Sequence, residues 1–452
     1  MNSPLHVLFA RELPRGWAIA TVDAIKASEK NACVAGPFGS DISSKYFATE
    51  GVPVIRGGNL SDDLTRFVPK NFVFVSPERA ASYRAQHVRA GDLVFTCWGT
   101  IGQVGLIPEN GPFLEYIISN KQLKLRPNTT LTDPVYLFYY FASPQMVAHV
   151  RNRAIGAAVP GINLGILKTL EVVVPPLAEQ RRIASILSAY DDLIENNTRR
   201  IAILEEMARR IYEEWFVRFR FPGHEGVRMV ESELGLVPEG WKVACLEDVC
   251  LGEDGIQTGP FGSQLHKSDY SEVGVPVLMP KDLIGFRINT ESITRIPMPT
   301  AARIGRHRMQ PGDIVYGRRG DIGRRAYIMA HQSGWICGTG CLRIRPDPAA
   351  IGGWYLFNFI GQDSVVGLIA GRAHGVTMPN LNTRLLESVP VVLPPRTLQD
   401  RFESMTFPLA MLRETLTAKN ANLRTTRDLL LPKLISGELD VSDLPEPQAA
   451  AA

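Results

Sequence analysis

A long stretch in the middle of the chain carries apolar residues at alternating steps of three and four. Residues 177–219 contain neither glycine nor proline, and Pro222-Gly223 follows shortly after them. The spacing is that of one helix face, and so narrow a stripe predicts packing against another helix. The stripe consists of Ile183, Leu187, Tyr190, Ile194, Ile201, Leu204, Ala208, Ile211 and Trp215, with Asn197 in its one gap.

A second long helix is predicted near the end of the chain, over residues 396–440. Its stripe has a spacing of seven, at Leu409, Leu416, Leu423 and Leu430. Pro408 predicts a bend or a broken first turn, because an interior proline removes a backbone hydrogen bond. A domain between the two helices returns the chain, so we expect an antiparallel coiled coil in which Asn197 and Asn420 are candidates for setting the register. The alternative is that each helix packs on its own globular domain.

The segments before each helix have another pattern, with short β-type runs between glycines and prolines. Strands are predicted at 71–75, 92–96 and 122–125, and again at 275–279, 313–316 and 342–344. Short helical runs at 135–141 and 354–360 accompany them. This mixture predicts an α+β fold with a strongly curved sheet in each globular part.

The two halves of the chain repeat each other. GPFGS stands at 36–40 and 259–263, GVPV at 51–54 and 274–277, and a Val/Leu-Pro-Pro closure at 174–176 and 393–395. Chance matches would not stay in the same order, so we infer a duplication. The predicted domains are 1–176, a spacer helix at 177–221, a second globular domain at 222–395, a distal helix at 396–440 and a disordered tail at 441–452.

Composition narrows the class further. The chain has 452 residues, 45% of them hydrophobic, and a formal net charge of +3, which permits nucleic-acid binding without requiring it. No apolar run is long enough to cross a membrane, so we expect a cytoplasmic protein. The six cysteines lack the spacing of zinc ribbons, so we expect free and mostly buried thiols and no metal site.

The segment GINLGILKTLEVVVPPLAEQRRI at 161–183, followed by the long helix, resembles the closing hallmark of a target-recognition domain in type I restriction-modification DNA-specificity (S) subunits. The second copy keeps the pattern from Pro379 to Gln399 but lacks the Glu before Gln399. The openings with Trp17 and Trp241 and the GPFGS…GVPV region are also typical of that family. The resemblance covers the chain from about Leu13 to Asp440.

The resemblance implies a non-catalytic subunit that reads a bipartite, asymmetric sequence in double-stranded DNA. It implies that the helices separate two readers and dock two modification (methyltransferase) subunits, with restriction subunits joining the full complex. S-adenosylmethionine, ATP and Mg are then expected on the partner subunits, with no cofactor in this chain. The absence of a phosphate-loop motif and of an NPPY-type methyltransferase motif agrees with a non-catalytic chain. The alternatives are a specificity subunit of a related bipartite-site system, or a non-catalytic coiled-coil scaffold.

Candidate DNA-binding residues lie where polar side chains differ between the two repeats. Glycine allows close backbone approach, arginine can bind guanine through two hydrogen bonds, and lysine or arginine can neutralise phosphate. GPFGS itself is identical in two domains that should read different sequences, which favours a shared structural turn. The candidates are Ser40, Lys45, Trp98, Arg153, Gln264, His266, Lys267, Arg318, Arg319, Arg324, Arg325 and Arg372. For each of them a structural role is the competing interpretation.

Overall fold

The computed structural model describes residues 13–39, 41–156, 159–284, 286–318, 322–372 and 381–445. The chain divides into two compact units. Unit 1 comprises residues 1–199 and 416–452, and unit 2 comprises residues 200–415. Each unit therefore contains one globular part and a segment of each long helix.

Unit 1 contains two four-stranded sheets and one two-stranded sheet, in the orders β2-β9-β6-β7, β4-β3-β8-β5 and β1-β10. Its strands are β1 (Ala18–Thr21), β2 (Cys33–Ala35), β3 (Val52–Ile55), β4 (Val73–Val75), β5 (His87–Val88), β6 (Leu93–Thr96), β7 (Val104–Leu106), β8 (Tyr116–Ile118), β9 (Gln122–Leu125) and β10 (Glu171–Val174). Its shorter helices are α2 (Val22–Ile25), α3 (Pro77–Ala81), α4 (Pro134–Ala142), α5 (Pro144–Asn152) and α6 (Leu164–Thr169).

Unit 2 repeats this arrangement with sheets β14-β22-β19-β20, β18-β15-β21 and β13-β23, and adds the small sheets β16-β17 and β11-β12. Its strands are β11 (Met229–Ser232), β12 (Gly235–Pro238), β13 (Lys242–Cys245), β14 (Ile256–Thr258), β15 (Val275–Leu278), β16 (Leu283–Ile284), β17 (Arg287–Ile288), β18 (Thr294–Ile296), β19 (Ile314–Gly317), β20 (Arg325–Tyr327), β21 (Ile336–Cys337), β22 (Cys341–Ile344) and β23 (Pro390–Leu393). Its shorter helices are α8 (Met298–Arg303), α9 (Gly353–Phe359), α10 (Asp363–Arg372) and α11 (Thr383–Glu387).

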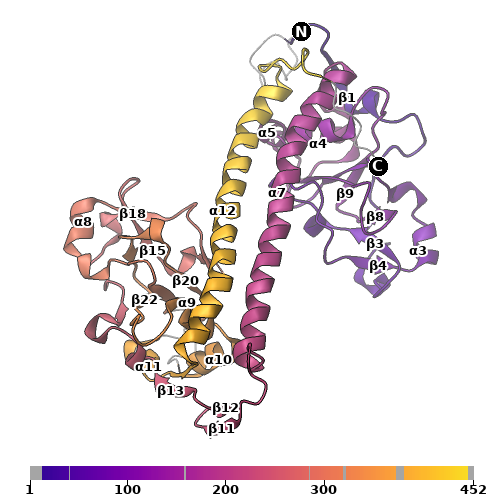
Figure 1. Ribbon diagram of the computed structural model, residues 1–452. Coiled ribbons are helices and arrows are strands. Elements are labelled where there is room, and N and C mark those ends of the chain that lie inside the picture. Colours follow the sequence, from indigo (N-terminus) through magenta and orange to yellow (C-terminus); the bar gives the residue numbers. More distant parts are fainter. Residues whose placement is uncertain are drawn as a thin grey trace. The chain divides into compact units, whose positions relative to one another are not determined.

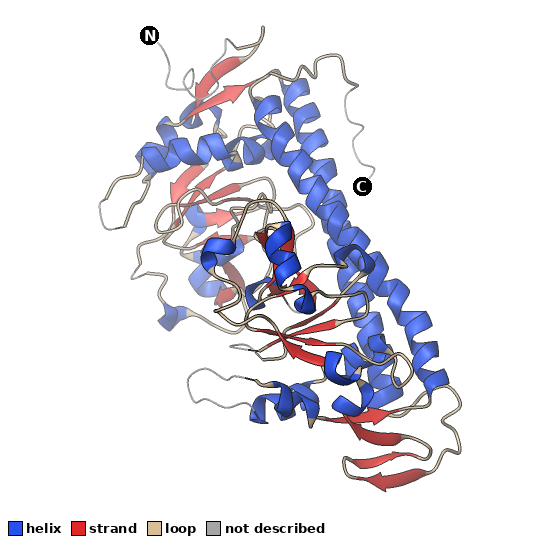
Figure 2. Ribbon diagram, turned by 90° about the vertical axis from the view of Figure 1, so that its left-hand side faces the viewer, coloured by secondary structure: helices blue, strands red, loops and turns tan. Residues whose placement is uncertain are grey.

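The predicted α+β class is confirmed. Each unit holds separate small sheets, where a single curved sheet was expected, and Figure 2 shows their short strands beside the long helices. The strand register shows the same repeat as the sequence. In unit 1 β1 pairs antiparallel with β10, Ala18 with Val174, and in unit 2 β13 pairs antiparallel with β23, Lys242 with Leu393. That pairing closes each globular part just before the double proline and its long helix.

The two long helices are α7 (Leu177–Tyr212), which continues as a π-helical turn over Glu213–Val217, and α12 (Arg396–Ile435). The helical assignment of α12 is unbroken across Pro408, so the broken turn predicted there is absent. Within each unit, contacts between the helix segments run in antiparallel order, as Figure 1 also shows. In unit 1, Asp191 meets Arg427 and Asn197 meets Asn420, and in unit 2, Glu205 meets Arg413 and Tyr212 meets Phe402. An antiparallel coiled coil along both helices stays a prediction.

The buried face of α12 is more polar than the apolar stripe suggests. Its buried positions include Thr406, Arg413, Asn420 and Arg427 at a spacing of seven, whereas Met405 and Leu412 are exposed. The predicted stripe residues Leu409, Leu423 and Leu430 are only half-buried. Asn420 is bonded from α7: the Asn197 Nδ2 donates to Asn420 Oδ1 over 2.9 Å, and Asn420 Nδ2 donates to Thr198 Oγ1 over 3.2 Å. Buried polar residues paired in this way favour one register over its neighbours.

The structure describes the first residues of the predicted tail. Val441, at the start of the predicted disordered tail, is buried and belongs to the core of unit 1, together with Leu431 and Leu434. Of the rest of that tail, residues 446–452 lie outside the described part of the chain. The domain division made from the sequence remains a prediction, because the compact units cut across both long helices.

Candidate nucleic-acid interface

A cleft of about 700 Å³ opens in unit 1 between the ends of its central strands. Four segments contribute to it: one that precedes β3, the β3–β4 connection, the β6–β7 turn and the β8–β9 turn. Two of these turns are tied together by the Cys97 N–H, which donates to the Lys121 carbonyl over 2.8 Å. The cleft residues are Ile42, Phe47, Arg56, Gly57, Gly58, Asn59, Lys70, Asn71, Thr96, Trp98, Gly99, Thr100, Gln103, Ser119, Asn120, Lys121 and Gln122.

The lining of this cleft is cationic and rich in amides. Arg56, Lys70 and Lys121 line it, and no aspartate or glutamate does. None of these three side chains has a carboxylate partner among the described residues. Since three unpaired cations attract an anion, the cleft suits phosphate, and its amides suit the edges of bases.

Two cleft residues have features that packing alone does not explain. The indole of Trp98 is 41% exposed and lies against the backbone of Gly161, where a Cβ atom would be only 2.4 Å from the ring. Gln122 is buried, yet its Nε2 has no hydrogen-bond partner within the described structure. A buried amide donor without an acceptor costs free energy, so it is a candidate to bind an acceptor that is absent from the isolated chain.

The equivalent loops of unit 2 have equivalent backbone hydrogen bonds but different side chains. The Arg318 N–H donates to the Gly340 carbonyl over 2.8 Å, which matches the bond between Cys97 and Lys121. Gly340 thus takes the position of Lys121, and along the same loops Met279 takes that of Arg56 and Glu291 that of Lys70. Gln103 is replaced by the exposed Arg324. The positive charge has therefore moved to the β19–β20 turn.

The candidate residues on that turn lie in different environments. The Arg318 Nε donates to the Leu381 carbonyl over 2.6 Å, so this side chain also supports the loop that follows residue 380. Arg325 is buried between the rings of Phe286 and Phe357, at 4.7 and 4.9 Å, and burial lowers its pKa to about 10. The candidate interface of unit 2 therefore includes Arg324 and does not include Arg325. Arg319 and Ser40 lie outside the described residues.

Arg153 and Arg372 occupy equivalent positions and make equivalent bonds. Arg153 donates to the Thr169 carbonyl over 3.3 Å, and Arg372 donates to the Ser388 carbonyl over 2.9 Å. Each guanidinium thus holds the end of the short helix that precedes the last strand of its repeat. This shared bond supports a structural role for both side chains.

Four further candidates are exposed beside the repeated GPFGS loop. Lys45 lies over the ring of Tyr46 at 4.6 Å in unit 1, while Gln264, His266 and Lys267 follow the loop in unit 2. The Gln264 Oε1 accepts from the Phe261 N–H, so this side chain also stabilises its own turn. Lys45 and Lys267 are in no ion pair with another described residue and are free to meet phosphate.

The sequence did not indicate Arg56, Lys70, Asn71, Gln103, Asn120 or Lys121 as parts of one site. They come from loops separated by up to 65 residues, and only the strand pairing brings them together. The available signal was the substitution between repeats, such as Lys121 against Gly340.

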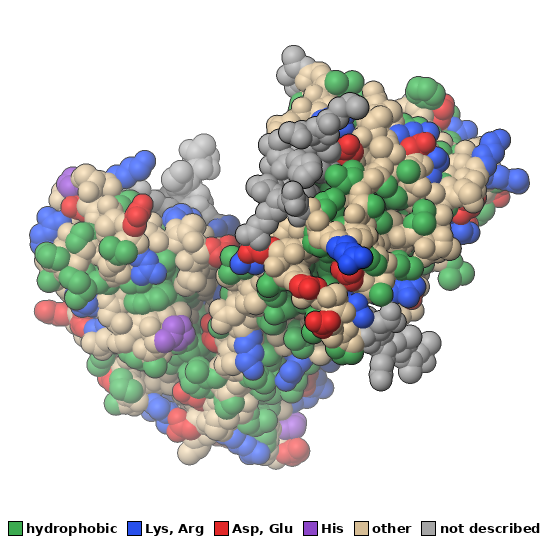
Figure 3. Space-filling model, turned by 90° about the horizontal axis from the view of Figure 1, so that it is seen from above, with side chains coloured by type: hydrophobic (Ala, Val, Ile, Leu, Met, Phe, Trp, Pro, Cys, Tyr) green, Lys and Arg blue, Asp and Glu red, His purple; other side chains and the backbone are tan. Residues whose placement is uncertain are grey.

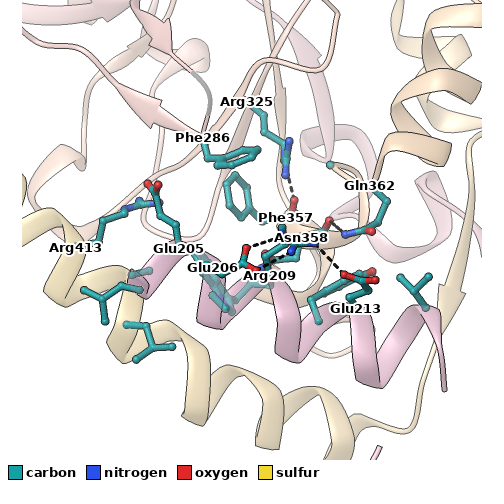
Figure 4. Close-up of a pocket in the computed structure, with 18 of the residues that line it drawn as sticks. Glu205, Glu206, Arg209, Glu213, Phe286, Arg325, Phe357, Asn358, Gln362 and Arg413 are labelled. Carbon is teal, nitrogen blue, oxygen red and sulfur yellow. Dashed lines mark hydrogen bonds and ion pairs between the residues drawn. The ribbon is translucent and has the colours of Figure 1, made fainter. Parts of the chain in front are cut away.

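A second cavity, of about 680 Å³, lies within unit 2 beside its segments of α7 and α12. Figure 4 shows that carboxylates and guanidinium groups alternate around it. Arg209 pairs with Glu206 and Glu213 at 2.8 Å, and Arg413 lies 3.9 Å from Glu205. Because its four carboxylates outnumber its three guanidinium groups, this cavity does not favour an anion as the unit 1 cleft does.

Charges are also mixed on the molecular surface. On the face shown in Figure 3, lysine and arginine side chains are interspersed with aspartate and glutamate. Among the described residues, no three potential ligands gather as a metal site, and no helix is long and apolar enough to span a bilayer. The six cysteines are free thiols, five of them buried, as expected.

The fold and the paired loops define a duplicated protein with one candidate DNA-reading face in each unit. Residues 39–206 match the family model described as the type I restriction modification DNA specificity domain. The resemblance to type I DNA-specificity subunits seen in the sequence is thereby confirmed.

Two proteins of Methanocaldococcus jannaschii are among the similar ones. The type I restriction enzyme MjaIX specificity subunit is 26% identical over 310 residues, which is 68% of this chain and 70% of the relative. The putative type I restriction enzyme MjaX specificity subunit is 24% identical over 440 residues, 95% of each chain. The fold is shared with the crystal structure of a type I restriction-modification system S subunit from M. genitalium, at a TM-score of 0.61 and 17% identity, covering 94% of this chain and 98% of that one.

Proposed function

We propose that the chain is the DNA-specificity subunit of a type I restriction-modification complex. In this role it is non-catalytic and binds a split, asymmetric sequence in double-stranded DNA, with each unit reading one half. One observation carries the proposal: two units with the same backbone frame present different polar side chains at the same loops. A pair of readers for two different half-sites requires this combination.

The long helices suit a role in assembly. The helix segments of both units have exposed polar faces, and the duplication offers a similar surface twice. We propose that each surface docks one modification (methyltransferase) subunit, and that restriction subunits join them. S-adenosylmethionine, ATP and Mg are then bound by those partners. A coiled-coil scaffold without a DNA target would not need an unpaired cationic cleft, which supports the DNA-binding role over that alternative.

Co-expression with the modification subunit encoded beside this gene tests the proposal. We expect a complex with two modification subunits per chain that methylates adenine in one bipartite sequence. The isolated chain should show no methyl transfer. Sequencing of methylated DNA from cells with and without the gene gives the readout, and a complex of one to one as the only active species would contradict the docking scheme.

A matched pair of variants tests whether the cleft of unit 1 reads one half-site. Lys121→Gly gives unit 1 the residue of unit 2, and the exposed Lys30→Gly removes a lysine that does not line the cleft. We expect Lys121→Gly to weaken one half-site and Lys30→Gly to leave both unchanged. Equal effects of the two variants would show that the cleft is not a reader.

A further inference from the structure

The GPFGS loop is the same in both units, but its residues lie in two different environments. Its first glycine and its proline are packed against the sheet. Its phenylalanine points outward: Phe38 is 84% exposed and Phe261 is 58% exposed. An aromatic ring that stays in water at the same place in two repeats has no packing role in either.

The loop is held firmly in both places. The Gly36 N–H donates to the Gln122 carbonyl over 2.9 Å, and the Gly259 N–H donates to the Cys341 carbonyl over 3.0 Å. A Cβ atom on Gly36 would stand 1.8 Å from the Ser119 carbonyl oxygen, so only glycine fits this approach. The geometry of the turn requires glycine at this position, but it does not account for the exposed phenylalanine.

In unit 1 the residue after the phenylalanine lies beside the candidate interface. Gly39 abuts the side chain of Asn120, which lines the cleft, since a Cβ atom there would be 3.0 Å from the Asn120 Nδ2. In unit 2 the Arg303 guanidinium donates to the Gln264 carbonyl over 3.3 Å, directly after the loop. In unit 1 the Arg79 guanidinium donates to the Asp41 carbonyl over 2.6 Å, so a guanidinium bonds the backbone three residues after each ring, and that of Arg303 also lies 3.6 Å from the Asp269 carboxylate.

The cleft lining differs between the units, but the exposed ring does not. A contact made in the same way at two different half-sites cannot depend on the base sequence. In duplex DNA the faces of the bases are stacked on one another, so an aromatic ring makes such a contact by wedging between base steps.

We propose that Phe38 and Phe261 each pack against the DNA of their own half-site, as sequence-independent contacts. This inference rests on the proposed function. The loops thus hold the DNA in place, while the neighbouring turns read it.

Phe38→Ser and Phe261→Ser, alone and together, test the inference in the full chain bound to its modification subunits. We expect each single variant to lower the affinity about tenfold, for cognate and for unrelated duplexes alike, as loss of one buried apolar contact would. The dependence of affinity on salt should stay the same, because no cation is removed. Leu114→Ser is the control, since Leu114 is 95% exposed and outside the repeated loop. It should bind as the parent does.

Three results would overturn the inference. One is unchanged affinity of the double variant, and another is a changed recognition sequence. The third is a variant that binds DNA normally but no longer retains the modification subunit, which would assign the rings to a protein contact. Failure of the parent complex to prefer any sequence would instead refute the proposed function, so the two claims fail separately.

Discussion

Unit 1 and unit 2 share their interior and differ at their loops. In both, a buried aspartate accepts two hydrogen bonds from the arginine directly after β9 or β22: Asp92 from Arg126 at 2.7 and 2.6 Å, and Asp313 from Arg345 at 2.7 and 2.8 Å. In both, a glutamine at the start of the long helix donates a hydrogen bond to the carbonyl of the first proline of the Pro-Pro pair. Gln180 donates to the Pro175 carbonyl and Gln399 to the Pro394 carbonyl, each over 2.8 Å.

The differences lie where side chains reach solvent or the helices. Lys121 of unit 1 corresponds to Gly340 of unit 2, and in the sequence Trp98 stands where unit 2 has Arg319, which lies outside the described residues. Next to the helices, Tyr139 of unit 1 bonds Asp191, while its counterpart Asn358 lines the cavity of unit 2. A duplicated fold can therefore keep its buried bonds and change its surface, because only the buried bonds are needed for folding.

The largest expected effect comes from breaking the shared interior. Asp92→Ala and Asp313→Ala should each destabilise their own unit by about 3 kcal/mol, because each removes the buried carboxylate of its ion pair and leaves the arginine only the more exposed Glu29 or Asp254. Denaturant unfolding measures both losses, and the exposed Asp62→Ala is the control. Similar losses in the two units would support a shared frame, whereas a loss in only one would show that the frames differ energetically.

A smaller effect, on binding alone, should separate the loops. Trp98→Ala should weaken one half-site and Arg324→Ala the other, each by about 1–3 kcal/mol. Binding to duplexes that carry one altered half-site at a time measures this. If either variant weakened both half-sites equally, the loops would not be separate readers.

The sequence predicted the frame better than the site. The repeat, the α+β class and both long helices followed from local patterns, because spacing and turn residues act over short distances. The cleft did not, since Arg56, Lys70 and Lys121 meet only through pairing of β3, β4 and β8 with their neighbours. The polar buried face of α12 was also missed, because an apolar stripe cannot show that Asn420 and Arg427 have partners on α7.

One departure from the repeat has a structural reason. The Glu179 carboxylate accepts a hydrogen bond from the Trp17 indole over 2.9 Å in unit 1. In unit 2 the corresponding Trp241 lies among Phe216, Phe219 and Phe221, and Leu398 replaces the glutamate and is buried.

Exchanging these two residues should therefore have unequal effects on the free energy of unfolding. Glu179→Leu should cost about 1 kcal/mol for one lost hydrogen bond. Leu398→Glu should cost more, because it buries a carboxylate without a partner. Thermal unfolding of the two variants tests the order, and a larger cost for Glu179→Leu would contradict it.

The smallest effect concerns pH. Lys124 is buried and donates to the carbonyls of Ala85 and His87, and burial lowers its pKa to about 8. Its unfolded pKa is about 10.4. Between these values the unfolded chain binds more protons, so this residue makes the protein more stable as pH rises from 8 to about 10.

Lys124→Met should remove that rise. Arg343→Met, at the equivalent position of unit 2, should not change the pH dependence in this window, because arginine stays protonated there. The measurement is the difference in unfolding free energy between parent and variant from pH 7.5 to 10. A difference that stays constant for Lys124→Met would show that Lys124 titrates normally.

The central claim is that two units of one frame read two different half-sites. The most direct test is a map of methylated adenines in a host that carries the modification subunit with this chain, and again with Lys121→Gly. The parent should methylate a split sequence with unlike halves, and the variant should relax one half while the other half and the gap stay the same. Methylation that does not depend on this gene, or a variant that alters both halves together, would contradict the account.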